Sequence, residues 1–454
     1  MKSSNRMNRR HSSTVLRLTL ALLALAAPLL AQSDSSQFVA FKQFLSNTQN
    51  ATAAEFLARP ETRTNSGDFQ QMRFYIVAMY QGVSVEHSFV ENEDYFDCIS
   101  VAQQPSARLA GINHIEAPPA ELPGGAKAAS PGDAPAATSF DRFGNSRSCE
   151  AGTIPMRRLT LDEMTQYSNL RAFLMRYHMG PDGQTIDQTA PPADEVRRWA
   201  TRDQTVNNLG GISEISLWDP AVADGQYFSL AQQWYSGGAG NALQTVEGGW
   251  TKYPTALKKK PHSVLFIFWS TQNYANGCYN LECAGFVQTD NTWELGGEFP
   301  GYSVVNGVQR WFTMEWYLVP NSQGQRNWWL LLKRDDQPVM RWIGYYPESV
   351  FTVNGVKGQM VQNAQRIVYG GETTSSTNSL PPMGSGRFPN QGWKRAAFHS
   401  NIKYTDTNRN VVNANLTTNQ QSQNCYLVAT PPVPQVAAWG TYFFFGGPGG
   451  NNCQ

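Results

Sequence analysis

The sequence predicts a mainly β protein, in which an antiparallel β-sandwich follows a small α+β region. Aromatic residues make up 12% of the chain and glycine is abundant, a composition typical of sheets joined by many turns. All thirteen tryptophans lie at Trp199 or later, so the composition changes sharply near that residue. Short strand-like runs separated by turn residues fill the second half, and no long helical pattern interrupts them. A chain of 454 residues is also long enough for more than one core.

The N-terminus is predicted to be an export signal that covers residues 1–31. Basic residues, among them Lys2 and Arg17, precede an apolar run from Leu18 to Ala31 that is shorter than a typical membrane span. A signal anchor is the alternative. Since no later segment is apolar enough to cross a bilayer, we expect a soluble protein that is secreted, to the periplasm or the medium, with no membrane contact after signal removal.

Residues 32–180 are expected to mix helices and strands. A first helix is indicated by the helical spacing of Phe38, Phe41 and Leu45. Strands are expected at Phe74–Met79 and Tyr95–Val101. Thr160 and Glu163 form a capping box, which predicts a helix with a buried stripe at Met164, Leu170, Phe173, Leu174 and Tyr177.

Two segments of this half have the composition of loops. Pro118–Ala137 is rich in proline, alanine and glycine, which is typical of a flexible loop. Residues 181–194 contain Pro181-Asp182-Gly183 and the pair Pro191-Pro192, and we expect them to be an exposed linker that proteases can cut.

The strand-like runs of the last segment, residues 195–454, favour an antiparallel sandwich over a parallel α/β sheet. They are expected at Ile212–Leu217, Val264–Trp269, Gly285–Gln288, Trp311–Val319, Trp328–Leu332, Met340–Tyr346, Arg366–Tyr369, Ala396–Tyr404 and Gly440–Phe445.

Charge and cysteine content narrow the class of function. The 36 basic residues nearly balance the 35 acidic ones and form no long run, which argues against nucleic acid as a partner. An even number of cysteines, six, fits an oxidising compartment. Their spacing does not fit zinc, so we expect no metal and no cofactor, and we interpret them as disulfides paired by proximity. The expected pairs are Cys278–Cys283, Cys425–Cys453 and Cys98–Cys149, although the sequence alone allows others.

Most familiar catalytic signatures are missing from the sequence. There is no His-Glu-x-x-His pattern, and His262 and His399 are the only histidines after Trp199. Ser385 lies between two glycines without the spacing of a nucleophile elbow. Cysteine nucleophiles are disfavoured if all six cysteines pair. Carboxylates remain the natural candidates.

Two glutamates lie in unusual surroundings. The segment Asn241–Trp250 alternates like a strand and meets two glycines after Glu247, and Arg366–Glu372 does the same in reverse order. Glycine within a strand marks a bulge or a close approach of another backbone, such as a peptide substrate. A glutamate beside glycine is also common on a solvated rim, and the Gly-Gly-Glu that ends at Glu298 shows that the tripeptide is unspecific.

From Asn207 to the C-terminus the chain resembles the catalytic domain of the neprosin family. The stretches that carry the resemblance are Thr245–Trp250, Gly277–Gln288, Trp328-Trp329, Ile343–Pro347, Tyr369–Glu372, Met383–Gly386 and Trp439–Gly449. In the first half, Asp97-Cys98 and Cys149–Arg158 resemble the inhibitory pro-segment of the family. Gly248 stands where the family leads us to expect alanine, and the loop before Cys149 is unusually long, so substrate preference stays open.

The resemblance implies a glutamic endopeptidase of the prolyl endopeptidase type, with a β-sandwich fold, that is made as an inactive zymogen. The family's catalytic glutamates fall on Glu247 and Glu372, whereas Glu298 matches none. It further implies that residues 32–180 are an inhibitory pro-segment and that residues 195–454 are the peptidase domain. Its partners would be polypeptides, proline-rich ones in particular, and its own pro-segment as an intramolecular inhibitor. We expect a monomer.

Paired glutamates suit peptide hydrolysis at acidic pH. Two close carboxylates do not both ionise easily, so one can take a proton from water while the other donates to the carbonyl oxygen. The pair titrates as one unit, and the sequence does not assign the two roles.

Further site residues follow from the same pattern. Gln232 matches the family, and it either stabilises the oxyanion or is a buried structural residue. An aromatic slot for proline and the backbone beside the second glutamate are expected to bind substrate: Trp250, Tyr279, Trp328, Trp329 and Gly371.

Two other functions remain open at this stage. Glycoside hydrolases also place paired carboxylates in a sandwich groove lined by aromatic rings. A non-catalytic sandwich that binds sugars or coats a surface is the second alternative. Digestion of casein at acidic pH would indicate a peptidase, and digestion of polysaccharide would indicate a glycoside hydrolase. A binding domain would hydrolyse neither.

Overall fold

The computed structural model describes residues 37–122, 128–129, 139–175, 196–223, 225–253, 262–375, 377–422, 424–434, 436–451 and 453. The predicted signal (1–31) and the predicted linker (181–194) lie outside the described residues. The chain divides into two compact units, Met1–Val39 and Ala40–Gln454. The helices and strands below all belong to the second unit.

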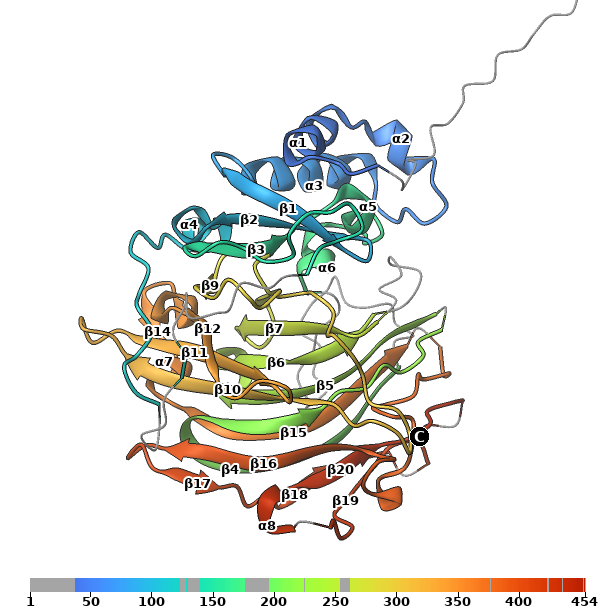
Figure 1. Ribbon diagram of the computed structural model, residues 1–454, viewed down its shortest axis with the longest axis vertical. Coiled ribbons are helices and arrows are strands. Elements are labelled where there is room, and N and C mark those ends of the chain that lie inside the picture. Colours follow the sequence, from blue (N-terminus) through green and yellow to red (C-terminus); the bar gives the residue numbers. More distant parts are fainter. Residues whose placement is uncertain are drawn as a thin grey trace, which may run out of the picture. The chain divides into compact units, whose positions relative to one another are not determined.

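The first part of this unit is a small α+β region, as the sequence predicted (Figure 1). Its strands β1 (Val85–Glu91), β2 (Asp94–Ser100) and β3 (Thr153–Arg157) form an antiparallel sheet in that order. Its helices are α1 (Phe41–Asn50), α2 (Ala53–Leu57), α3 (Ser66–Met79), α4 (Pro105–Leu109), α5 (Leu161–Met164) and α6 (Leu170–Met175), with a 3₁₀ turn η1 (Val101–Gln103).

Two sequence predictions in this region need correction. The expected strand Phe74–Met79 is the end of α3, because buried residues recur there at helical spacing, at Phe69, Met72, Ile76 and Met79. Thr160 does cap a helix through the N–H of Glu163, but that helix ends at Met164 and a second one, α6, follows. Met164 and Phe173 of the predicted stripe are buried, and Tyr177 lies outside the described residues.

The rest of the unit is mainly β, as predicted. Its strands are β4 (Val196–Ser216), β5 (Gln226–Gly237), β6 (Gln244–Lys252), β7 (Val264–Thr271), β8 (Asn276–Tyr279), β9 (Val287–Gln288), β10 (Trp311–Pro320), β11 (Arg326–Arg334), β12 (Arg341–Tyr346), β13 (Thr352–Val353), β14 (Val356–Lys357), β15 (Ala364–Ser375), β16 (Ala397–Asp406), β17 (Val411–Asn413), β18 (Thr418–Gln420), β19 (Leu427–Ala429) and β20 (Phe443–Gly446). Short helical turns connect them, at η3 (Gly240–Ala242), η5 (Glu348–Phe351), α7 (Gln359–Gln362), η6 (Pro389–Gln391) and α8 (Val436–Trp439).

Strand β4 belongs to both layers of the sandwich. Its first part, up to Asn208, pairs with β15, in a layer ordered β8-β7-β6-β5-β15-β4. Its second part, from Gly210, pairs with β10 and β16, in a layer that continues through β11, β12 and β9. Gly210 has φ +109°, and a Cβ there would lie 2.0 Å from the carbonyl oxygen of Trp316. Only glycine fits at this change of layer.

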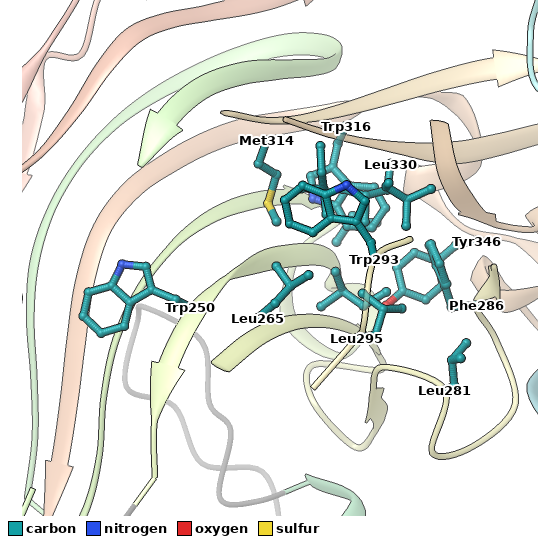
Figure 2. Packing of buried hydrophobic residues seen from close by; sticks show 14 of the residues in the cluster. Trp250, Leu265, Leu281, Phe286, Trp293, Leu295, Met314, Trp316, Leu330 and Tyr346 are labelled. Atoms are coloured by element: carbon teal, nitrogen blue, oxygen red, sulfur yellow. The ribbon is translucent and has the colours of Figure 1, made fainter. Parts of the chain in front are cut away.

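The core lies between these layers. Trp250 and Leu265 of the first layer and Met314 and Trp316 of the second belong to one buried cluster (Figure 2). The rings of Trp316 and Tyr346 stack at 5.5 Å between centroids. A hydrogen bond from the Gln233 amide on β5 to the Met314 carbonyl oxygen on β10 (2.9 Å) also joins the layers. The predicted sandwich is therefore confirmed.

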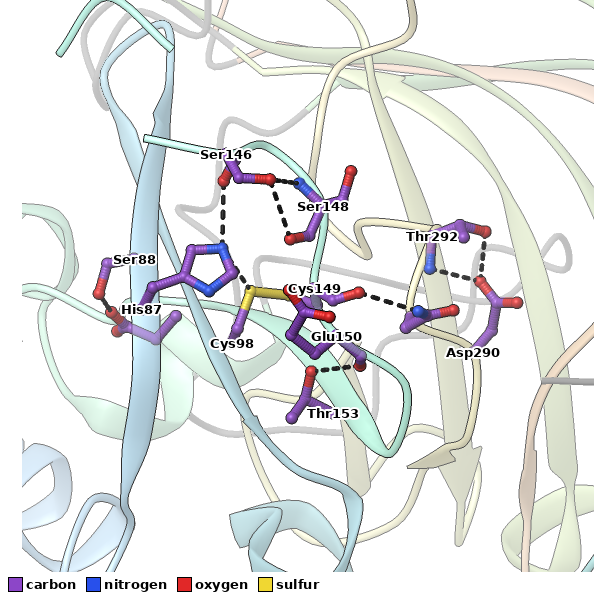
Figure 3. The surroundings of a disulfide bond; sticks show 12 residues. His87, Ser88, Cys98, Ser146, Ser148, Cys149, Glu150, Thr153, Asp290 and Thr292 are labelled. Atoms are coloured by element: carbon purple, nitrogen blue, oxygen red, sulfur yellow. Dashed lines mark hydrogen bonds between the residues drawn. A yellow bond between two sulfur atoms is a disulfide. The ribbon is translucent and has the colours of Figure 1, made fainter. Parts of the chain in front are cut away.

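All three predicted disulfides are present: Cys98–Cys149, Cys278–Cys283 and Cys425–Cys453. The first joins β2 to the segment before β3, so no disulfide links the α+β region to the sandwich. Figure 3 shows the surroundings of this disulfide, with His87 and Ser146 beside it. The Asn291 side chain of the sandwich donates to the carbonyl oxygen of Cys149 at 2.9 Å.

Polar groups around Glu282 are among the contacts between the α+β region and the sandwich. The Arg157 guanidinium pairs with its carboxylate at 2.8 Å, and the Tyr75 hydroxyl donates to its carbonyl oxygen at 2.6 Å. Gln104 donates to the Gln288 carbonyl oxygen (3.0 Å) and accepts from its N–H (2.8 Å). Among the described residues, no helix is both long and apolar enough to span a bilayer.

Candidate active site

Strand register places Glu247, Gln232 and Glu372 on one face of three neighbouring strands, β6, β5 and β15. Glu247 lies opposite Trp234, and Glu372 lies opposite Leu230. Residues 230, 232 and 234 of β5 point to the same face because side chains alternate along a strand. All three side chains of the site are fully buried.

Two glycines flank Gln232 in the row between the glutamates. Gly249 is its partner on β6 and Gly370 its partner on β15. A Cβ at Gly249 would lie 1.9 Å from the carbonyl oxygen of Ala231, and one at Gly370 would lie 2.2 Å from that of Ala200. The close backbone approach expected from these glycines is thus made by neighbouring strands. Because glycine has no side chain, only Gln232 projects from this row.

Glu247 accepts hydrogen bonds from two neutral groups. The Tyr274 hydroxyl donates to its Oε1 at 2.8 Å, and the Gln232 amide donates to its Oε2 at 3.3 Å. Both partners are buried. This site therefore holds the carboxyl in a fixed orientation on the sheet face.

Glu372 forms an ion pair with the Arg197 guanidinium of β4. Both side chains are buried, with 4% of Arg197 and 0% of Glu372 exposed. The guanidinium carbon also lies 5.6 Å from the ring centre of Phe228. Arg197 of β4 is thus one of the groups that hold Glu372 in place.

The pKa of the Tyr274 hydroxyl depends on both glutamates. Burial raises its pKa well above 10, and the charges of Glu247 and Glu372 raise it further. The phenol therefore keeps its proton and remains a donor at acidic and neutral pH. Since both charges act on one phenol, the two carboxyls share one electrostatic environment.

The turn that carries Tyr274 is strained. Gln272, Asn273 and Tyr274 have φ values of 53°, 56° and 65°, so three consecutive non-glycine residues are left-handed. Such residues are costly and persist where the surrounding structure holds them, often at functional sites. The sequence did not point to Tyr274, because nothing in its spacing marks it.

Comparison with protein families identifies most of the second half of the chain. The Neprosin family model matches residues 225–448. These residues form a neprosin domain. It contains Gln232, Glu247, Tyr274 and Glu372, whereas Arg197 precedes it.

Part of the chain is also similar to several solved structures. One is described as scytalido-glutamic peptidase with a peptide based transition state analog, at 11% identity and TM-score 0.30, covering 55% of this chain and 98% of that chain. Another is SCP-B, a member of the eqolisin family of peptidases in a complex with a tripeptide, at 11% identity and TM-score 0.27 over the same shares. The alginate lyase Aly36B follows, at 9% identity and TM-score 0.17, covering 40% of this chain and 79% of that chain.

Aromatic side chains surround the pair on the same face of the neprosin domain. We call this cluster the aromatic face; it comprises Tyr227, Phe228, Leu230, Trp234, Phe266, Phe268, Tyr274, Tyr279 and Val368. Met175, the last described residue of α6, packs against it. The end of the α+β region therefore reaches the surface that carries the glutamates.

Of the residues expected to bind substrate, only Tyr279 lies on the aromatic face. Trp250 occupies the opposite face of β6, where its indole N–H donates to the Ser216 carbonyl oxygen at 2.8 Å. Gly371 also faces the core, since a Cβ there would lie 2.7 Å from the sulfur of Met383.

The two remaining tryptophans belong to the second layer. Trp328 lies in the core and donates to the Met360 carbonyl oxygen at 2.8 Å, and Trp329 packs on Tyr345 at 4.7 Å between ring centres. The structure therefore does not bring these two, or Trp250 and Gly371, together with the glutamates. Glu298 is also elsewhere, bonded to Asn92 of the α+β region.

Proposed function

We propose that this protein is a secreted endopeptidase that hydrolyses peptide bonds with Glu247 and Glu372. The neprosin domain supports a peptidase. The observation that carries the proposal is the pair of fully buried glutamates on one sheet face, with Gln232 and its two flanking glycines, Gly249 and Gly370, in the row between them.

Hydrolysis needs one base and one acid, and this pair supplies both. An ionised carboxylate takes a proton from water as the water oxygen bonds to the scissile carbon. A protonated carboxyl gives its proton to the carbonyl oxygen. When the carbon–nitrogen bond breaks, the nitrogen takes the proton held by the base, and the acid regains its own. The Gln232 amide lies beside Glu247 and can orient the carbonyl group.

The aromatic face is the proposed binding surface for the residue before the scissile bond. Proline packs well on flat rings, and Tyr279, Trp234 and Phe228 surround the pair on this face. A preference for cleavage after proline is part of this proposal. Tyr279 and its neighbours on the aromatic face are the residues proposed to bind proline. Trp250, Trp328 and Trp329 are not part of this surface.

The α+β region is proposed to be an inhibitory pro-segment, released in acid. Its α6 ends with Met175 packed on the aromatic face, so it covers surface that a peptide substrate would use. Arg157 and Glu282 hold it to the sandwich. The three disulfides are consistent with secretion, and none would prevent removal of the pro-segment. The expected cut near Ala193 lies outside the described residues.

The test is digestion of a denatured proteome by the full chain after incubation at about pH 4, a pH near the ordinary glutamate pKa. Mass spectrometry reports both activity and the residue before each cut. We expect peptides that end in proline, a shortened enzyme, and neither change with Glu372→Gln. Polysaccharide hydrolysis without peptide hydrolysis would favour a glycoside hydrolase. No hydrolysis of either substrate class would favour a binding domain.

A further inference from the structure

Two buried polar atoms on the face that carries the glutamates have no hydrogen-bond partner in the described part of the chain. They are the side-chain oxygen Oε1 of Gln232 and the indole nitrogen Nε1 of Trp234. Only 0% of Gln232 and 1% of Trp234 is exposed. Buried polar groups are nearly always hydrogen-bonded, because a group that loses water without gaining a partner costs free energy. An unpaired acceptor beside an unpaired donor in a candidate active site is a combination that a bound ligand would complete.

The two residues are neighbours on one face of β5. Gln232 lies in the row between the glutamates, and Trp234 lies opposite Glu247. Residues two apart on a strand project to the same side, about 6.6–6.8 Å from each other. An extended peptide repeats its N–H and carbonyl groups along one edge at the same interval. The spacing of Gln232 and Trp234 therefore suits a main chain that lies across both side chains.

The two unpaired atoms are also complementary to a peptide main chain. An amide oxygen accepts a hydrogen bond and an indole N–H donates one, whereas each residue of a peptide other than proline offers an N–H and a carbonyl oxygen. The nitrogen of the Gln232 amide already donates to Oε2 of Glu247 at 3.3 Å, so its oxygen is left for another group. We propose that the Gln232 oxygen accepts a substrate N–H and that the Trp234 indole donates to a substrate carbonyl oxygen. This inference rests on the proposed peptidase function.

The arrangement restricts where the site accepts proline. Proline has no N–H, so the substrate residue that bonds to the Gln232 oxygen is not a proline. The proline proposed to precede the scissile bond is therefore a different residue, whose ring rests on the aromatic face. A proline facing Gln232 would leave the amide oxygen buried and unpaired, which sites built to hydrogen-bond a substrate reject. The site thus favours proline at one position and refuses it at another.

The same chemical groups occur unpaired elsewhere in the sandwich, which provides matched controls. Oε1 of Gln288 on β9 and Nε1 of Trp218, which follows β4, are also buried without a partner among the described residues. Gln288 lies in the other layer, and Trp218 belongs to the core cluster between the layers. Neither residue is on β5, where the acceptor and the donor lie side by side. Removal of these two groups should leave substrate binding unchanged.

The test measures kcat/KM of acid-treated protein on a series of peptides that share one cleavage site. Each N–H near the scissile bond is removed in turn by N-methylation, and each carbonyl oxygen is replaced in turn by sulfur, which is a poorer acceptor. With the wild type, one N-methylated position and one thiocarbonyl position should each lower kcat/KM by about tenfold.

The variants connect each loss to its side chain. Gln232→Met keeps the length of the side chain without the amide, so N-methylation at the sensitive position should lower its kcat/KM by less than about threefold. Trp234→Phe keeps an aromatic ring without the N–H, and the sensitive thiocarbonyl should lose its effect in the same way. Gln288→Met and Trp218→Phe should respond to both modified peptides as the wild type does.

The wild-type scan can overturn the proposal by itself, if no N-methylated position and no thiocarbonyl position lowers kcat/KM. Sensitivities that persist undiminished in Gln232→Met and Trp234→Phe, or that the two controls lose as well, would also overturn it. If Gln232→Met is too slow to assay, the wild-type scan and Trp234→Phe decide, because each unpaired atom predicts its own sensitive position.

Failure of the proposed function has a different signature. In that case the wild type hydrolyses none of the peptides, or Glu372→Gln retains hydrolysis. If the inference alone fails, the wild type is active, Glu372→Gln is not, and each modification has the same effect in the wild type and in the variants. A purely structural role of Gln232 or Trp234 would lower the unfolding temperature and reduce kcat/KM for all peptides by one factor, which leaves the ratio between parent and modified peptides unchanged.

Discussion

The two faces of the strands β6, β5 and β15 differ in composition. Successive residues of each strand point alternately to one face and then to the other. On the face toward the second layer, Trp250 and Tyr235 are buried in the core. The Trp250 indole N–H donates to the Ser216 carbonyl oxygen, and the Tyr235 hydroxyl donates to the side-chain oxygen of Gln233. On the opposite face, Glu247 and Glu372 are buried among aromatic rings, and the side-chain oxygen Oε1 of Gln232 has no hydrogen-bond partner in the described part of the chain. The comparison teaches that one strand can contribute to stability with one side chain and to chemistry with the next.

The largest effect is expected from the glutamates. Glu247→Gln and Glu372→Gln keep the shape of the side chain but can neither hold nor release the proton, so kcat should fall by about a thousandfold or more. Circular dichroism and the unfolding temperature should show an intact fold. Glu298→Gln is the control and should change turnover little. Near-normal turnover of folded Glu372→Gln would contradict the mechanism.

Trp250 tests the core face of the same strand. Trp250→Ala removes a large buried ring and should lower the free energy of unfolding by about 3–5 kcal/mol. Because Trp250 points away from the glutamates, kcat per folded molecule should remain within about twofold of the wild type. Urea titration and an active-fraction assay measure the two quantities. A loss of turnover as large as that of the glutamate variants would break the division between the faces.

Glu315 is a buried carboxyl outside the candidate site, and its raised pKa makes the stability of the fold depend on pH. It lies on β10, and burial raises its pKa to about 7, although Lys403 opposes the shift. Since this pKa is higher than in the unfolded chain, Glu315 contributes stability that is fully present below about pH 4.5 and is lost as the pH rises through about 7. Glu294 follows the same rule, with a pKa raised to about 7 by burial.

The matching experiment compares Glu315→Gln with its parent at pH 4 and pH 8, both in the Glu372→Gln background to prevent self-digestion. The parent should lose about 3 kcal/mol more stability than the variant over this range. His399 acts in the other direction, because burial lowers its pKa to about 3 and its contribution is lost as the pH falls. His399 is present in both proteins and cancels in the difference. Equal slopes for the two proteins would contradict a raised pKa at Glu315.

Tyr279 is expected to give the smallest effect. Tyr279→Leu keeps an apolar side chain on the aromatic face but removes the flat ring, so KM for a prolyl peptide should rise about tenfold, equivalent to about 1.4 kcal/mol. Trp329→Leu is the matched control, since Trp329 packs in the second layer. Steady-state kinetics of the two variants measure the difference. Similar KM values for both variants would remove Tyr279 from the binding surface.

Much of the fold could be predicted from the sequence. The turn-separated strands, the tryptophan boundary and the three cysteine pairs led to the right architecture, because these signals are local. The prediction of a strand at Phe74–Met79 was wrong, because the β-branched and aromatic residues of this segment are typical of strands. The segment is helical, and the buried residues Phe69, Met72 and Ile76 recur at helical spacing. Strand β5, which carries Gln232, was missed as a strand because it is buried on both faces and does not alternate.

The site was predictable only in part. Glu247 and Glu372 could be selected from motifs, but their partners depend on strand register and on a turn far from them in sequence. Arg197 sits among other arginines in β4, so only the pairing with β15 distinguishes it. The aromatic residues were chosen by type, and the choice of Trp250 ignored that a shift of three residues from Glu247 reverses the face.

The position of β4 limits how a mature enzyme can begin. This strand starts at Val196, carries Arg197 as its second residue and takes part in both layers. If the proposed pro-segment is removed, we expect exoproteolytic trimming of the new end to slow at Val196, where the paired strand begins. One residue further, the first layer would lose its pairing with Ser375 and the cation beside Glu372 would become the chain terminus. A ragged set of N-termini that stops abruptly at this strand is the expected mark of natural maturation.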